Sequence, residues 1–288
     1  MTLLPIRFMM IVDRASVQEA EKQHIYNYSI EKTLTEDAVW EKDIKKHFAN
    51  VPENIRNIWV YGFLEIFNNA LDHSKGKKIT VVIDESRIFT AMSICDDGIG
   101  IFNNIKNGFK LPDEKDALLE LAKGKRTTDK KRHSGQGIFF TSRAFDIFYI
   151  SSNSLTYGLV PPGNQTDTFK SSTMVYIGLA NNSEKILKNV FDEFSTEIPG
   201  DFDKTYIPVR LANSADLVSR SQARRILSGL ELFKEVILDF NDIAYIGQAF
   251  ADEIFRVFKN IHPHTTIMAQ NANEEVQYMI NRAVNTKI

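Results

Sequence analysis

The sequence predicts an α+β domain followed by a smaller α/β domain. One strong amphipathic helix lies at residues 50–74, and two apolar stretches typical of β-strands follow it at 77–85 and 88–101. After residue 203, strand and helix patterns alternate, which is typical of a small α/β domain. The length of 288 residues also fits two domains, at roughly 100–200 residues each.

The elements of the first domain follow from their apolar patterns. Residues 3–12 read as a core strand, and residues 14–50 as mostly helical, with Trp40 and Phe48 as apolar anchors. Residues 103–134 combine many charges with little apolar periodicity apart from ALLELA, which indicates a long mobile segment; loops of this length are usually functional or disordered. A glycine-opened helix and two strands complete the domain; these strands lie at residues 147–154 and 173–180.

The pattern of strands and helices is interrupted near residues 194–205, and a second domain begins after this break. Strands are expected at 206–212, 235–240 and 265–270, and helices at 219–233, 248–261 and 273–284. We therefore expect an N-terminal extension at 1–34, a first domain at 35–182 with a lid at about 103–134, a linker helix at 183–202 and a second domain at 203–288.

Composition and charge exclude several classes of protein. The net charge of -2 provides no overall basic field, so direct binding to nucleic acid is not expected. The single cysteine, Cys95, excludes an intrachain disulfide framework and fits a reducing compartment. No run reaches the roughly 18 apolar residues of a membrane span, and Arg7 interrupts the apolar N-terminus, which disfavours a signal peptide. The sequence predicts a cytoplasmic protein without a membrane partner.

The helix at residues 50–74 carries an unusual polar stripe. Glu65, Asn69 and His73 follow one another at four-residue steps and therefore share one helix face. A carboxylate one turn from a carboxamide oxygen suits a site for magnesium and phosphate, since magnesium prefers hard oxygen ligands. The alternative is that these side chains only face solvent.

A second polar motif, CDDGIGI, ends the strand at residues 88–101. Asp96 follows an apolar run, and Gly98 and Gly100 allow close approach of a ligand or positive φ angles. A buried carboxylate at this place could accept a hydrogen bond from the amino group of adenine. A simple strand-to-turn connection remains the alternative explanation.

A third motif, HSGQGIFF, opens a helix. Gly135, Gln136 and Gly137 lie at its N-terminus, where free N–H groups and the helix dipole favour phosphate. A cationic run at residues 123–132 precedes the motif. We expect only one or two of its members to contact phosphate, with Lys125 as the candidate, and the rest to be solvated.

The order and spacing of these three motifs resemble the GHKL ATP-binding superfamily, over roughly residues 35–180. This group comprises the ATPase domains of DNA gyrase, heat-shock chaperones, MutL and histidine kinases, together with the anti-sigma-factor serine kinases. The resemblance is closest to the anti-sigma kinase-like branch, because the module is small and lacks a transducer domain. It implies a GHKL-type two-layer α/β sandwich with a mixed sheet covered by helices, and ATP and Mg²⁺ as cofactors.

The resemblance also implies roles for individual residues. Glu65 would be the catalytic, water-activating glutamate, Asn69 the magnesium ligand and Asp96 the adenine-reading carboxylate. Thr173 would lie near adenine at the start of the last strand. The remaining expected nucleotide contacts are His73, Gly98, Gly100, Lys125, Gly135, Gln136 and Gly137.

The C-terminal domain resembles the STAS-like domain of unknown function that is often fused behind this type of ATPase. STAS domains of anti-sigma-factor antagonists carry a phosphorylatable serine where a helix follows the strand that here reads VILDF. The corresponding stretch is GQAFAD, and no serine or threonine lies between Asn241 and Asn260. Phosphorylation in cis at the usual position is therefore not expected.

Together these features predict a Mg-ATP-binding regulatory switch with slow, weak ATPase activity. The lid and the STAS-like domain would couple nucleotide state to an unidentified regulatory protein. One alternative is an anti-sigma-type serine/threonine kinase acting on a separate partner, and another is a non-catalytic ATP-binding scaffold. A histidine kinase is disfavoured, because His24 and His47 are poor acceptor candidates. His262 and His264 lack further ligands at the spacing of a zinc site, so no zinc site is expected at these two residues. The resemblance to the family is the only basis for expecting a homodimer.

Overall fold

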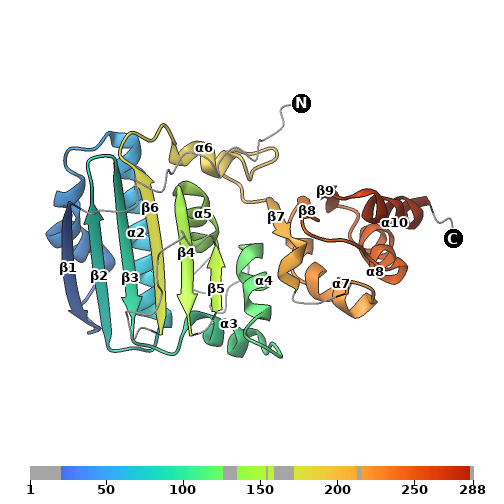
Figure 1. Cartoon of the computed structure of the whole chain (residues 1–288), viewed down its shortest axis with the longest axis horizontal. Helices are drawn as coiled ribbons and strands as arrows, with labels where there is room; N and C mark the ends of the chain where they lie inside the picture. Colours follow the sequence, from blue (N-terminus) through green and yellow to red (C-terminus); the bar gives the residue numbers. More distant parts are fainter. Residues whose placement is uncertain (1–20, 126–134, 154, 159–171, 213–215, 286–288) are drawn as a thin grey trace. The chain divides into compact units, whose positions relative to one another are not determined.

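The computed structural model describes residues 21–125, 135–153, 155–158, 172–212 and 216–285. The chain divides into two compact units (Figure 1). The N-terminal unit comprises residues 1–100 and 141–186, and the C-terminal unit comprises residues 101–140 and 187–288. Most of the segment expected to be a lid thus belongs to the same unit as the C-terminal domain.

The N-terminal unit is built on a six-stranded sheet in the order β1-β2-β3-β6-β4-β5. Every neighbouring pair is antiparallel, so the expectation of a mixed sheet is wrong for the described strands. Strands β3 and β4 do run in the same direction, but β6 lies between them. The strands are β1 (Lys22–Ser29), β2 (Lys78–Glu85), β3 (Phe89–Asp96), β4 (Ile147–Ser152), β5 (Leu155–Gly158) and β6 (Thr173–Ala180).

Strand β1 corrects the helical prediction for residues 14–50. His24, Tyr26 and Tyr28 lie on its less exposed face and alternate with exposed residues. This period of two is typical of a half-buried strand, but polar residues on both faces hide it in the sequence. The helical part begins later, with α1 (Glu36–Val39), η2 (Trp40–Ile44) and η3 (Lys45–Phe48). The expected strand at residues 3–12 lies outside the described residues.

Helix α2 (Glu53–His73) confirms the strongest sequence prediction, and it packs on β3 and β6 (Figure 1). Its apolar face is buried and Trp59 contacts Phe145 edge-to-face. The predicted anchors Trp40 and Phe48 are also buried, with their rings stacked 5.7 Å apart. The buried residues of α2 are Ile55, Ile58, Trp59, Gly62, Phe63, Ile66, Phe67 and Ala70.

The C-terminal unit contains a three-stranded parallel sheet in the order β7-β8-β9, which confirms the predicted α/β alternation. The first strand ends at Pro208, and a 3-10 turn replaces the rest of the stretch predicted at 206–212. The elements are β7 (Lys204–Pro208), η5 (Val209–Ala212), α7 (Arg220–Leu227), η6 (Leu230–Leu232), β8 (Glu235–Asp239), α8 (Gln248–Asp252), η7 (Glu253–Phe258), α9 (Lys259–Ile261), β9 (Thr266–Gln270) and α10 (Glu274–Asn285).

The expected lid contains two helices in its described part, α3 (Ile101–Phe109) and α4 (Asp116–Lys123). Helix α4 packs on β7 and η5 within the C-terminal unit (Figure 1). Helix α4 coincides with ALLELA, the one apolar stretch expected in this segment, whereas α3 was not predicted; α3 packs on α4, and α4 meets partners far away in the sequence. Helix α5 (Gly137–Ala144) follows, and α6 (Leu187–Asp192) lies within the expected linker.

No helix among the described residues is both long and apolar enough to cross a membrane.

Candidate functional site

The polar stripe predicted on α2 lies at the margin of its buried face. Glu65, Asn69 and His73 are neither fully buried nor exposed, in contrast to the apolar residues beside them. Tyr61 lies one turn before Glu65, and its pKa is raised by burial and, secondarily, by the charge of Glu65. The helix therefore holds a carboxylate, a carboxamide and an imidazole along one partly covered face. Oxygen atoms in such a row can hold a hard cation.

Asp96 ends β3 as a buried carboxylate, with a relative exposure of 7%. Its Oδ1 accepts a hydrogen bond from the Gly98 N–H at 2.9 Å, and the Thr173 side chain also hydrogen-bonds to it. Thr173 is its partner in the register of β3 and β6. Burial raises the pKa of Asp96 to about 6, although both hydrogen bonds oppose the shift.

The two glycines after Asp96 hold the strand end against α2. A Cβ on Gly98 would lie 2.0 Å from the carbonyl oxygen of Ser74, and the Ile99 N–H donates to that oxygen at 2.8 Å. Gly100 has a positive φ of 85°. These contacts explain why glycine is needed at both positions, and they join the end of the α2 stripe to the Asp96 loop.

Asp96 and its neighbour Asp97 have opposite electrostatic environments. The N–H groups of Lys78 and Lys77 donate to Asp97 Oδ1, at 2.9 and 2.6 Å, and lower the pKa of Asp97. Burial instead disfavours the ionised form of Asp96. Adjacent residues of the same type therefore provide a matched pair for measuring what the buried carboxylate contributes to stability.

We expect Asp96→Asn to stabilise the fold at neutral pH, by about 1–3 kcal/mol. The ordinary pKa of 3.8 rises to about 6 in the folded protein, so the native state binds more protons between these values. Stability due to Asp96 is therefore present at low pH and is lost as the pH rises through 6. In urea unfolding curves, the gain in free energy of unfolding of Asp96→Asn over wild type should become smaller toward pH 4.

Asp97→Asn is the control for this measurement. Because the pKa of Asp97 is lowered, its contribution is present at neutral pH and is lost in acid, so this variant should be destabilised near pH 7. Equal effects of the two substitutions at every pH would contradict the assignment of Asp96 as an electrostatically strained carboxylate.

The other predicted site residues belong to the C-terminal unit. Gly135 has a φ of 75°, Gln136 accepts a backbone hydrogen bond from Phe140 through its carbonyl oxygen, and Gly137 begins α5. Lys125 donates from Nζ to the Leu232 carbonyl at 2.9 Å. Its ammonium group also lies over the Phe233 ring, 4.8 Å from the centroid. Glu65, Asn69, His73, Asp96, Gly98, Gly100 and Thr173 all belong to the N-terminal unit.

A buried ion pair lies at the end of α4, and no sequence pattern had indicated it. Lys123 is fully buried, and its Nζ donates to Glu120 Oε1 at 2.8 Å. The same ammonium group donates to the carbonyl oxygens of Arg225, at 3.0 Å, and Ser228, at 2.9 Å, at the end of α7. The Arg225 guanidinium in turn lies 3.0 Å from the buried carboxylate of Asp116. Ionic and hydrogen-bond contacts of Lys123 and Asp116 therefore hold α4 against the C-terminal end of α7.

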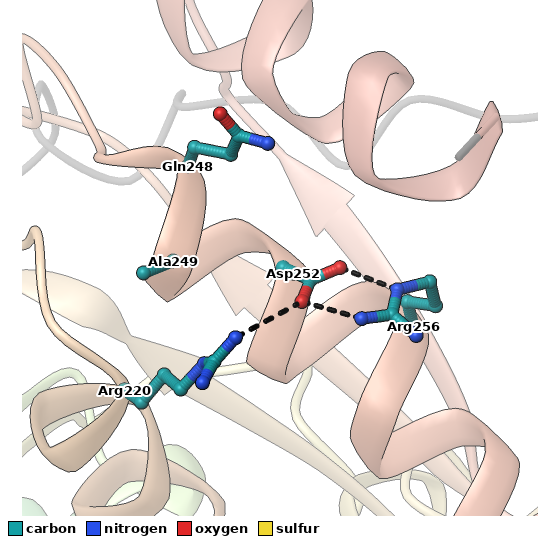
Figure 2. A pocket seen from close by; sticks show the side chains of 5 residues that line it. All are labelled: Arg220, Gln248, Ala249, Asp252 and Arg256. Carbon is teal, nitrogen blue, oxygen red and sulfur yellow. Dashed lines mark hydrogen bonds and ion pairs between the residues drawn. The ribbon is translucent and has the colours of Figure 1, made fainter. Parts of the chain in front are cut away.

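A cavity of about 380 Å³ lies at the start of α8, lined by Arg220, Gln248, Ala249, Asp252 and Arg256 (Figure 2). Two nitrogens of the Arg256 guanidinium donate hydrogen bonds to the Asp252 carboxylate, and the Nη2–Oδ2 distance is 2.6 Å. Arg220 lies 4.0 Å from the same carboxylate. The hydrogen bond from Arg256 is the main reason that the pKa of Asp252 is lowered. Arg220 also lies 4.0 Å from the Glu253 carboxylate, so two guanidinium groups are matched by two carboxylates here.

The C-terminal residues 222–277 match the family model of a STAS-like domain of unknown function (DUF4325). The C-terminal domain is STAS-like. The matched segment contains β8, the helical run from α8 to α9, and β9, together with parts of α7 and α10. No curated protein matches the chain. In this STAS-like domain the cavity in Figure 2 presents Gln248 and Ala249 at the helix start, where neither side chain has a hydroxyl group.

Proposed function

We propose that this chain is a Mg-ATP-binding regulatory switch of the GHKL class. In this proposal the N-terminal unit binds the nucleotide and hydrolyses it slowly. The segment containing α3 and α4 and the STAS-like domain transmit the nucleotide state to a protein partner. The observation that carries the proposal is the buried Asp96 carboxylate, held at the end of β3 by Gly98 and Thr173.

The residues present fit the proposed cofactors. Burial of the Asp96 carboxylate costs free energy that the hydrogen bonds from Gly98 and Thr173 offset only in part, since its pKa stays raised. The amino group of adenine is a suitable further donor for this carboxylate. Asn69 supplies the amide oxygen that would hold Mg²⁺, which neutralises phosphate charge when bound. Glu65, one turn away, would orient the attacking water.

The contacts of α4 support the regulatory part of the proposal. Lys123 and Asp116 are buried against residues of α7 and its C-terminal end, so the expected lid and the STAS-like domain share one packed unit. A ligand shifts an equilibrium only through contacts that differ between two states. Phosphate contacts made by this segment would therefore alter the presentation of the STAS-like surface to a partner.

The first test is calorimetric titration with ATP and magnesium. We expect wild type to bind one ATP per chain and Asp96→Asn to bind roughly 10- to 150-fold more weakly. This range corresponds to the roughly 1.5–3 kcal/mol of a hydrogen bond to a charged group. Asp97→Asn is the matched control, because Asp97 already accepts two backbone N–H groups. It should bind ATP like wild type.

Two results would reject this proposal. Wild type that binds no adenine nucleotide would leave only a resemblance of fold, and equal affinities of the wild type and Asp96→Asn would remove Asp96 from the site. Amide hydrogen exchange in the same samples tests the coupling. Addition of ATP should slow exchange in α4 and α7, and unchanged exchange in both helices would limit the function to nucleotide binding.

A further inference from the structure

A cluster of two histidines and one glutamate lies on the N-terminal unit, at residues that have no part in the proposed nucleotide site. His24 comes from β1, His47 from η3 and Glu85 from the end of β2. Their potential ligand atoms all lie within 4.8 Å of one another. Three separate elements therefore bring two imidazoles and a carboxylate to one point.

The register of β1 and β2 explains part of this arrangement. Glu85 pairs with Lys22, and His24 lies two residues farther along β1 on the same face of the sheet. His47 then covers this face from the short helix η3. Its ring centroid lies 4.5 Å from that of His24.

The distances fit a metal site whose ligands would need only small movements. His47 Nδ1 lies 2.7 Å from Glu85 Oε1, and His24 Nε2 lies 3.7 Å from Glu85 Oε2. Ligands of a tetrahedral zinc ion lie about 3.3 Å apart, because zinc bonds to nitrogen and oxygen are about 2.0–2.2 Å long. The observed distances fall on both sides of this value.

The surroundings of His47 match those of a metal-binding histidine. Tyr26 hydroxyl lies 2.7 Å from His47 Nε2, which leaves Nδ1 directed toward Glu85. A hydrogen bond to the second ring nitrogen is the usual means by which proteins orient such a ligand. The His47 side chain is only 6% exposed, whereas that of His24 is 37% exposed, so solvent can reach the cluster from the His24 side.

We propose that His24, His47 and Glu85 form a Zn²⁺ site. Two imidazoles and one carboxylate are a donor set that suits zinc, and a water molecule could complete a tetrahedron from the exposed side. Such a site would join edge strand β1 and the helical segment at residues 45–48 to the end of β2. It would stabilise the edge of the sheet and is independent of ATP.

The test is titration of chelator-treated full-length protein with zinc chloride, in buffer without nucleotide or magnesium. We expect one zinc per chain and at least 100-fold weaker binding for His24→Ala and for Glu85→Gln. Tyr26→Phe should weaken binding by about 10- to 100-fold, as loss of an orienting partner does in other zinc sites. Cobalt substitution should give the visible absorption of a four-coordinate ion, and that absorption should disappear in His24→Ala.

The control is His264→Ala, which removes an exposed histidine of the STAS-like domain and should leave zinc binding unchanged. His24→Ala is preferred to a substitution at the buried His47, because the half-exposed residue can be removed with less damage to packing. Circular dichroism should verify that each variant is folded. Absence of zinc binding by wild type would overturn the proposal, as would folded His24→Ala and Glu85→Gln variants that bind zinc as tightly as wild type.

Discussion

Replacing Lys123 with methionine is expected to lower the free energy of unfolding by about 3–5 kcal/mol, the range measured when one partner of a buried ion pair is removed. The Lys123 ammonium group has no exposed surface and donates to Glu120 and to the Arg225 and Ser228 carbonyls. Methionine has a similar volume and preserves most of the packing. The loss of stability would therefore report the buried charge and its hydrogen bonds to these acceptors. Urea unfolding monitored by circular dichroism measures it.

Two further variants separate charge from packing in this experiment. Lys115→Met makes the same change at an exposed position before α4 and should shift stability by less than about 0.5 kcal/mol. Combining Lys123→Met with Glu120→Gln also removes the charge of the buried carboxylate that has lost its ammonium partner, so it should recover part of the loss. Equal stability of Lys123→Met and Lys115→Met would contradict a structural role for the buried ammonium group.

This ion pair also connects stability with the proposed switch. Asp116 and Lys123 begin and end α4, and both are bonded to residues at the C-terminal part of α7. If α4 transmits nucleotide state, Lys123→Met should reduce the effect of ATP on hydrogen exchange in α7. Nucleotide affinity itself should change less, because the adenine contact proposed for Asp96 belongs to the N-terminal unit.

Strong periodicity made α2 and the strand–helix alternation predictable from sequence. In α2, apolar residues recur at helical spacing from Ile55 to Ala70, and in the C-terminal domain each apolar strand is followed by a helix. Strand β1 was missed because polar side chains occupy both of its faces. His24, Tyr26 and Tyr28 are partly covered because the segment at residues 36–48 packs beside them, and Tyr28 also contacts Phe67 of α2.

Sequence patterns could suggest members of the candidate site only where polar residues interrupt a local apolar pattern. Asp96 and the α2 stripe stand out because polar residues interrupt apolar runs. Lys123 looks like one member of a solvated cationic run, and its burial depends on carbonyl groups about one hundred residues later in the chain. His24, His47 and Glu85 likewise have no recognisable spacing, since three separate elements bring them together. Tertiary contacts of this kind cannot be inferred from one-dimensional patterns.

Glu65→Ala is expected to slow ATP hydrolysis by about 10²- to 10⁴-fold, the usual contribution of a positioned acid–base group. Affinity for ATP should stay within a factor of two of wild type, because the proposed role of Glu65 concerns water and not the nucleotide. Released phosphate measures hydrolysis, and calorimetry on the same samples measures binding. The two readouts together distinguish loss of catalysis from loss of the site.

Asp72→Ala provides the matched control for Glu65→Ala, because it removes an exposed carboxylate from the same helix, outside the Glu65, Asn69 and His73 stripe. It should leave both binding and hydrolysis unchanged. Equal hydrolysis by Glu65→Ala and wild type would remove Glu65 from catalysis, and a parallel loss of binding would make it a ligand contact. If wild type binds ATP without measurable hydrolysis, Glu65 has no water to activate. The switch would then be reset by nucleotide exchange, and the contacts of α4 with α7 would respond to occupancy alone.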